Sequence, residues 1–119
     1  MSPADERASR IALWNDRLRK CAPIGLGRYG MTVCTYGIGL LAPATQSDLL
    51  ERIRTFDDFS EENDPYQERD FGLVRLPCGL NTYWKIDYYA DQTCSAGAED
   101  PADPEQCFRV LTIMLASEY

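Results

Sequence analysis

Two segments of the chain carry apolar residues at the three- and four-residue spacing of an amphipathic α-helix. The first opens with Ser2 and Pro3, which suit the N-cap and the first helical position, and acidic residues follow in its first turn. Its apolar positions are Ala4, Ala8, Ile11, Trp14, Leu18 and Cys21. The second opens with Pro43, and its apolar positions are Leu49, Leu50, Ile53 and Phe56. The pattern predicts helices over residues 3–20 and 43–56.

Three other segments alternate apolar and polar residues, which is the pattern of a half-buried β-strand. They span residues 29–35, 70–76 and 81–89. Because the turn-forming stretch Pro77-Cys78-Gly79-Leu80 separates the last two, we expect them to form a hairpin. In the last strand the alternation predicts one face for the core, with Trp84, Ile86 and Tyr88, and one face for solvent or a partner, with Tyr83, Lys85, Asp87 and Tyr89.

The C-terminal segment, residues 104–117, carries signals for both kinds of element. Asp103, Pro104 and Glu105 supply a helix start, with a cap, a proline and an acid in succession. The run that follows is apolar nearly all round and contains Val, Thr and Ile, which would suit a central strand. The start signal, together with Met114, Leu115 and Ala116, favours a helix, and we predict one over residues 104–117.

These elements predict an α+β fold in a single domain over residues 1–119. We expect a small antiparallel three-stranded sheet covered by about three helices, in the order α-β-α-β-β-α. A chain of 119 residues is long enough to bury one core, and a hydrophobic content of 45% is that of a folded protein.

The net charge of −7 is unevenly distributed along the chain. The fourteen residues 57–70, here called the acidic loop, contain seven acidic residues and one basic residue, Arg69. Residues 91–105 contain five acidic and no basic residues, whereas residues 1–28 contain six basic and three acidic ones. Because such a negative field repels phosphate backbones, the sequence argues against direct nucleic-acid binding. It predicts instead a protein partner with a basic surface.

The chain contains no histidine, which excludes Ser-His-Asp, Cys-His and His-based zinc chemistry, and we expect no cofactor. Its five cysteines are an odd number without a C-x-x-C pair, which suits reduced thiols in a cytosol. No stretch approaches the apolar length of a membrane span, and no apolar run follows a basic start at the N-terminus. We therefore expect a soluble, cytoplasmic protein with no membrane partner.

The acidic loop is the first candidate site. Its acidic residues are Asp57, Asp58, Glu61, Glu62, Asp64, Glu68 and Asp70. Carboxylates with the Asn63 amide would suit calcium or magnesium, but the ligand spacing of an EF-hand loop is not met. A catalytic site would pair Asp64, Glu68 or Asp70 so that one carboxyl acts as a general acid. A binding surface requires only exposed charge and no particular spacing of the residues, so the sequence favours it over a metal site or a catalytic site.

The outward face of the last predicted strand is the second candidate site. Lys85 and Asp87 are two residues apart and therefore adjacent on one strand face. A buried lysine can act as a nucleophile or base, but a surface ion pair is the commoner outcome. Tyr89 shares the face, and we include these three residues in the predicted binding surface.

Three blocks of the sequence resemble a bacterial family classified only as a domain of unknown function. They are F-D-D-F with N-D-P-x-x-E-x-D-F-G (residues 56–59 and 63–72), Y-W-K-I-D-Y-Y (83–89), and D-P-A-D-P with R-V-L-T-I-M-L-A-S-E-Y (100–104 and 109–119). The resemblance covers residues 28–119 and implies relatives in alphaproteobacteria, on plasmids and prophages. Relatives carry histidines within the first block, where this chain has Tyr66, Gln67 and Arg69. The family has no established activity to transfer.

The setting on mobile elements, together with the charge, suggests a small acidic non-enzymatic protein-binding module. We expect an inhibitor of a bacterial defence system, of the anti-CRISPR or anti-restriction type, that binds a basic nucleic-acid-binding surface. One alternative is a carboxylate-based or metal-dependent hydrolase that uses the acidic loop and Lys85. Another is a structural subunit or homodimer that associates through Trp84 and the neighbouring tyrosines.

Overall fold

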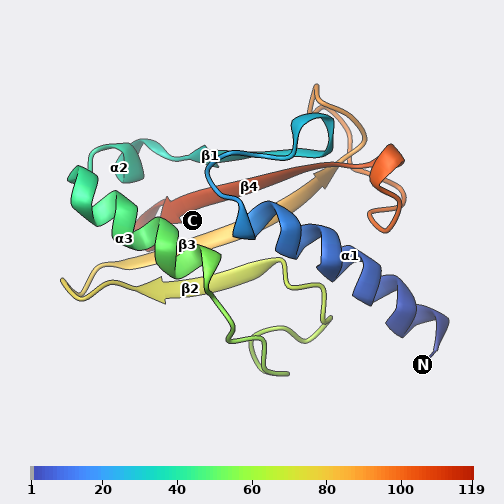
Figure 1. The fold of residues 1–119 in the computed structure, drawn as a ribbon, viewed down its shortest axis with the longest axis horizontal. Coiled ribbons are helices and arrows are strands. Elements are labelled where there is room, and N and C mark those ends of the chain that lie inside the picture. The colour runs from blue at the N-terminus through green and yellow to red at the C-terminus, as the bar shows by residue number, and fades with distance from the viewer. Residues whose placement is uncertain (1) are drawn as a thin grey trace.

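A computed structural model of the protein describes residues 2–119. Two long helices lie across one face of a four-stranded sheet (Figure 1). The elements are α1 (Pro3–Lys20), η1 (Gly27–Tyr29), β1 (Gly30–Cys34), α2 (Tyr36–Gly39), α3 (Pro43–Arg54), β2 (Phe71–Arg75), β3 (Asn81–Tyr89), η2 (Pro104–Gln106), β4 (Phe108–Leu115) and η3 (Ala116–Glu118), where η denotes a short 3₁₀ turn. The α+β class is confirmed.

Both predicted N-terminal helices are present. Ser2 Oγ accepts a hydrogen bond from the Asp5 N–H at 3.2 Å, and the Asp5 carboxylate accepts one from the Ser2 N–H at 3.4 Å. This reciprocal capping box fixes the start of α1 where the sequence places it. α3 ends at Arg54, two residues before the predicted end, because the Phe56 N–H bonds to the Ile53 carbonyl in a tighter turn.

The sheet has the strand order β1-β4-β3-β2. β3 pairs antiparallel with both β2 and β4, so the predicted hairpin of β2 and β3 is confirmed. β1 pairs parallel with β4, from Gly30 opposite Arg109 to Cys34 opposite Ile113. The prediction of a three-stranded antiparallel sheet is therefore wrong: the sheet is mixed and has four strands.

The fourth strand is the segment predicted as a helix over residues 104–117. The start signal is genuine, because the Asp103 carboxylate accepts the Glu105 N–H at 3.0 Å, but it opens only the single turn of η2. The apolar run after it, β4, lies between β1 and β3 and is buried on both faces. A strand in that position requires near-continuous apolar sequence, and its Val, Thr and Ile residues favour extended backbone.

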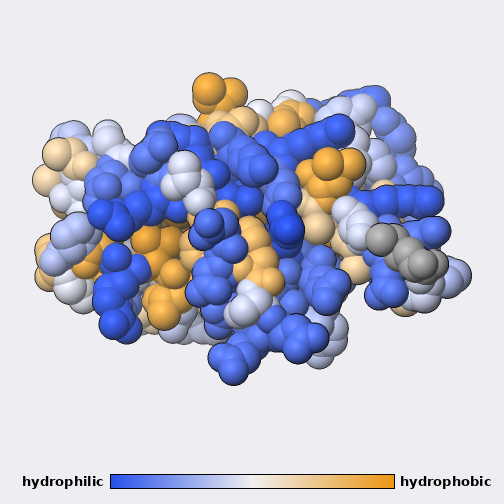
Figure 2. Space-filling model, turned by 60° about the horizontal axis from the view of Figure 1, so that its bottom comes forward, coloured by the Kyte–Doolittle hydropathy of each residue, from blue (hydrophilic) through white to orange (hydrophobic). Residues whose placement is uncertain are grey.

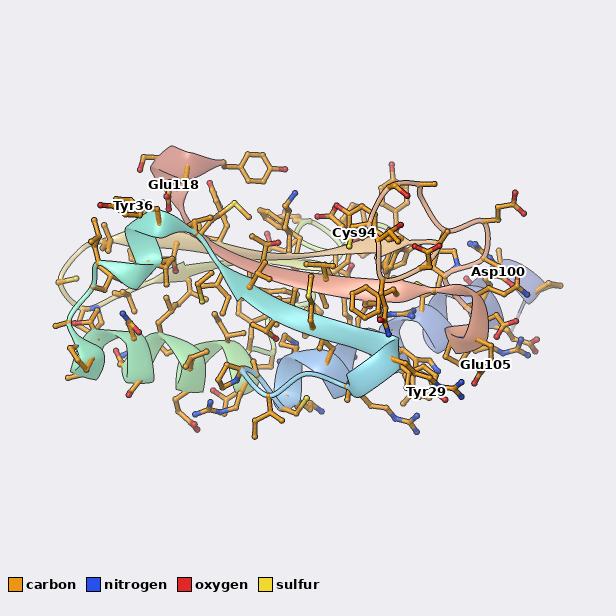
Figure 3. The ribbon with its side chains drawn as sticks, turned by 90° about the horizontal axis from the view of Figure 1, so that it is seen from above. Tyr29, Tyr36, Cys94, Asp100, Glu105 and Glu118 are labelled. Atoms are coloured by element: carbon orange, nitrogen blue, oxygen red, sulfur yellow. The ribbon has the colours of Figure 1, made fainter. Side chains whose placement is uncertain are left out.

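The two faces of the sheet differ in what covers them. α1 and α3 lie below the sheet in Figure 3, on the face that buries Trp84, Ile86, Leu111 and Ile113. Above the sheet, within the part of the chain that the structure describes, η3 lies at one end and the loop that carries Cys94 lies at the other (Figure 3). The predicted alternation in β3 is confirmed, since Trp84 and Ile86 are 0% and 4% exposed while Tyr83, Lys85 and Asp87 are partly exposed.

No helix within residues 2–119 combines the length and the apolar character needed to cross a lipid bilayer.

Gly72 in β2 lies against the ring of Phe56, the residue directly before the acidic loop. A Cβ at this position would overlap the indole nitrogen of Trp84 and the Phe56 ring. The two rings meet edge to face with centroids 5.4 Å apart. Phe56, two residues after the end of α3, can therefore pack on Trp84 in this way only because residue 72 has no side chain.

We expect Gly72→Ala to lower the free energy of unfolding by about 1–3 kcal/mol, because the added methyl group overpacks this contact. Gly39→Ala is the matched control, since a Cβ there meets no atom within 4 Å. Denaturant titration of both variants checks the prediction. Equal stability of Gly72→Ala and the wild type would contradict the packing described here.

Candidate functional site

The acidic loop connects α3 to β2 without regular secondary structure, and buried contacts fix its path. Asp64 is 5% exposed, and its carboxylate accepts the Arg69 N–H at 3.1 Å. Gln67 and Arg69 have positive φ angles of 58° and 57°, which turn the chain back toward the sheet. Asp64 therefore stabilises the loop backbone and is not displayed to a partner.

Aromatic and ionic contacts attach the loop to α1 and to the sheet. Phe59 packs edge to face on Phe56 at 5.2 Å and on Trp84 at 6.2 Å between ring centroids. Arg69 lies over the Phe59 ring at 4.9 Å and pairs with Asp16 of α1 at 3.0 Å. The loop is thus held at both its beginning and its end.

Asn15 of α1 is the centre of a buried polar network and is itself 0% exposed. Its amide nitrogen donates to the Glu68 carbonyl at 2.9 Å and to the Tyr88 hydroxyl at 2.8 Å. Its amide oxygen accepts from Arg109 Nε at 2.8 Å. One side chain therefore joins α1, the acidic loop, β3 and β4.

The Tyr88 hydroxyl links this network to the carboxylate of Glu68. It donates to Glu68 Oε1 at 3.0 Å while it accepts from Asn15. Burial of the ring, with the hydrogen bond to Glu68 and the nearby carboxylates, raises the pKa of Tyr88, so the phenol remains protonated. Glu68 is thus used within the structure, as Asp64 is.

Asp70 is the most perturbed carboxyl group of the loop. Burial raises its pKa to about 6, and repulsion from Glu68 adds to the shift. Its backbone is part of the sheet, because its carbonyl accepts the Ile86 N–H at 2.8 Å. Three of the seven predicted loop residues, Asp64, Glu68 and Asp70, are therefore buried or half-buried.

The other four acidic side chains of the loop are exposed, and we call Asp57, Asp58, Glu61 and Glu62 the outer carboxylates. Asp58 accepts a hydrogen bond from the Asn63 amide at 2.8 Å. Within residues 2–119 none of the four forms an ion pair, whereas the adjacent helix pairs Asp48 with Arg52 at 3.0 Å and Glu51 with Arg54 at 2.9 Å. The loop displays negative charge that the protein itself leaves uncompensated.

The other three predicted site residues, Lys85, Asp87 and Tyr89, lie on the opposite face of the sheet from Trp84. They are therefore separated from the buried and half-buried acids of the loop. Lys85 Nζ pairs with Asp87 Oδ2 at 3.0 Å, as predicted for a surface ion pair. This hydrogen bond raises the pKa of Lys85, which is the opposite of what a nucleophilic lysine requires. The ten predicted site residues therefore do not form one continuous surface.

Sequence analysis missed Asn15 and Arg109. Asn15 lies four residues after Ile11 and three before Leu18, so it is a polar residue on the apolar face of its helix. Arg109 interrupts the apolar run of β4, and burial lowers its pKa. A polar residue at an expected core position was the signal that could have identified both.

In the part of the chain that the structure describes, no three His, Cys, Asp or Glu side chains are grouped to hold a metal ion. The seven acids of the loop lie within fourteen residues, but four of them are exposed while Asp64 is buried and Glu68 and Asp70 are half-buried.

The chain belongs to the family described as Protein of unknown function (DUF3768), whose model matches residues 34–118. The match begins at the end of β1 and leaves α1 outside it. No curated protein and no solved structure matches the chain.

We expect Asp70→Asn to stabilise the protein at high pH. Because folding raises the pKa of Asp70 from 3.8 to about 6, its ionisation opposes folding. The stability that neutral Asp70 contributes is complete below pH 3.8 and is lost as the pH rises through 6. The full shift in pKa corresponds to about 3 kcal/mol, and solvent screening of the half-buried group reduces this value. The gain in the free energy of unfolding should therefore grow from near zero below about pH 4 to about 1–2 kcal/mol at about pH 8.

Urea titrations across this pH range measure the effect, with Asp57→Asn as the control for loss of an exposed carboxylate. Parallel pH profiles for Asp70→Asn and the wild type would show that Asp70 ionises in the folded protein as it does in water.

Proposed function

We propose that this DUF3768 protein is a non-enzymatic protein-binding module whose outer carboxylates contact a basic surface of its partner. One observation carries the proposal. Asp57, Asp58, Glu61 and Glu62 are exposed within six consecutive positions, and none has a basic partner within residues 2–119. Glu6 and Glu99 are also exposed without a basic partner among the described residues, but they lie far apart in the sequence, whereas these four carboxylates are clustered in one loop.

The rigidity of the loop supports binding over a purely solvating role. Its backbone is held by Asp64 and by the contacts of Phe59 and Asn15, so the displayed charges need little ordering when a partner binds. Preorganisation of this kind lowers the conformational entropy lost on association. Displayed negative charge also accelerates the encounter with a basic partner.

The partner we propose is a bacterial defence nuclease or interference complex, inhibited in the manner of an anti-CRISPR or anti-restriction protein. A groove that normally holds phosphates presents Arg and Lys side chains at close spacing, and carboxylates satisfy the same donors. The net charge of −7 disfavours binding of nucleic acid itself, so competition for the groove is the consistent mode of action.

A carboxylate-based enzyme is the second candidate, and Asp70 is the observation in its favour. A carboxyl group with a pKa of about 6 beside Glu68 has the pairing that a general acid requires. Glu68 is, however, already an acceptor for Tyr88. A hydrolytic activity lost in both Glu68→Gln and Asp70→Asn would favour this candidate over the binding module.

We expect Glu61→Lys with Glu62→Lys to weaken binding of the partner strongly, because two carboxylates that would face its basic surface become cations. The control is Glu6→Lys with Glu99→Lys, which changes the net charge equally at exposed sites away from the loop. Each immobilised protein is exposed to lysate of the native host, and the proteins eluted by salt are assayed for nuclease activity. Wild type and control should retain a nuclease that free wild-type protein inhibits, whereas the loop variant should bind it about tenfold or more weakly.

Equal retention by the loop variant and the control would contradict the proposed role of the outer carboxylates. Retained proteins without nuclease activity would contradict the proposed partner.

A further inference from the structure

β2 is an edge strand of the sheet, and its outer side has unpaired backbone groups. The Ile86 N–H bonds to the Asp70 carbonyl at 2.8 Å, and the Leu76 N–H bonds to the Leu80 carbonyl at 2.9 Å. In an antiparallel pair such bonds recur at every second residue, so the even-numbered residues of β2 bond inward to β3. The N–H and C=O groups of Phe71, Leu73 and Arg75 therefore point away from the sheet.

A groove follows this free edge. One cavity of about 250 Å³ is lined by Phe56, Asp58, Glu62, Asn63, Phe71, Gly72 and Leu73. A second, of about 320 Å³, is lined by Arg52, Thr55, Phe56, Asp57, Asp58, Leu73, Val74 and Arg75. Because Phe56, Asp58 and Leu73 line both, the two cavities lie side by side along β2, and we call them together the edge groove.

The figures show the same arrangement. In Figure 1 the acidic loop descends below β2 and returns to it, at the side of the sheet away from β1. Figure 2 brings that side of the molecule forward and shows apolar surface enclosed by hydrophilic side chains. The free edge of β2 thus lies beside a surface that contains both apolar and charged side chains.

The charge of the edge groove indicates what it accepts. Asp58 and Glu62, both exposed, line the end next to Phe71. At the other end Arg52 pairs with Asp48 at 3.0 Å, whereas Arg75 donates to the neutral Asn81 amide at 3.1 Å and keeps its charge. With Asp57 also in the lining, three carboxylates that are unpaired within residues 2–119 face this one uncompensated arginine, so the groove is negative on balance. The groove therefore offers unpaired backbone groups, the apolar side chains of Phe56 and Leu73, and unpaired negative charge.

We propose that an extended segment of the partner protein, with Lys or Arg at alternate positions, adds to β2 as a fifth strand. Its backbone would pair with the outward groups of Phe71, Leu73 and Arg75. Alternate side chains of a strand point to the same side, so its basic residues would meet Asp58 and Glu62 along the acidic loop. This inference rests on the proposed function, because it assigns the binding mode of the same surface.

A second copy of this chain fits the edge less well than a basic partner. Pairing of two β2 strands is isologous, so the same patch of each copy faces the other. Both acidic loops would then lie at the shared edge, and the outer carboxylates of one copy would approach those of the other. Like charges brought together in this way oppose association.

The test uses a short synthetic peptide in which Lys alternates with Thr and, as its control, the same peptide with Glu in place of Lys. Backbone amide NMR of the wild-type protein reports the binding mode directly. We expect the Lys peptide to shift the amide signals of Phe71, Leu73 and Arg75 and to protect them from exchange. The inward amides of Gly72 and Val74 should change much less, because they are already bonded to β3.

Leu73→Pro removes one outward N–H without removing a bond to β3, and Leu73→Val is the matched control that keeps it. Leu73→Pro should weaken binding of the Lys peptide about tenfold or more, and Leu73→Val should not. If Leu73→Pro does not fold, the alternating pattern of amide shifts in the wild type still shows whether the peptide adds to β2 as a strand.

The outcomes separate the two proposals. The Lys peptide could bind in a way that depends on Asp58 and Glu62 but shifts the β2 amides without alternation and loses no affinity in Leu73→Pro. That result would overturn strand addition and leave the acidic binding surface intact. Equal binding of the Glu peptide would overturn both. A wild-type dimer in sedimentation that Leu73→Pro dissociates would assign the edge to a second copy and overturn the basic partner.

Discussion

The structure depends on the hydrogen bonds of one buried amide, that of Asn15. Its three bonds, all between 2.8 and 2.9 Å, join α1 to the end of the acidic loop, to β3 and to β4. A buried amide that lacks its partners costs free energy, so the arrangement of these four segments in which all three bonds form is favoured over the alternatives. The network therefore fixes where α1 crosses the sheet and where the loop re-enters it.

This constraint determines how the seven acids of the loop divide. With the Glu68 carbonyl held by Asn15 and its carboxylate by Tyr88, the end of the loop faces inward, and Asp70 follows it into a half-buried position. The first half of the loop is held by aromatic rings instead, which bury Phe56 and Phe59 against Trp84 and leave the intervening acids in solvent. The loop is acidic throughout, but its second half is packed into the fold, whereas its first half displays the outer carboxylates to solvent. The displayed half lies beside the free edge of β2, so charge and unpaired backbone are available to the same partner.

The sequence predicted what local pattern determines. The spacing of apolar residues places α1 and α3, and the alternation around Trp84 gives both the hairpin and its buried face. The sequence-based prediction failed where residues far apart in the chain determine the structure of a segment. Asp103 and Pro104 are a true start signal, but the chain after them becomes a central strand because β1, far away in sequence, pairs with it. The inward turn of Asp64 was missed for another reason. Its partner, the Arg69 N–H, is close in sequence, but the turn needs positive φ angles at Gln67 and Arg69, and neither is a glycine that would have indicated them.

Asn15 holds the acidic loop in its displayed conformation. Hydrogen exchange of Asn15→Ala measures this most directly, with Leu13→Ala, an exposed position on the same helix, as the control. The account predicts that amides of the acidic loop, the Arg69 N–H among them, exchange about tenfold or more faster in Asn15→Ala, while those of the β2–β3 hairpin stay protected. Exchange in the loop that is unchanged from the wild type would contradict it.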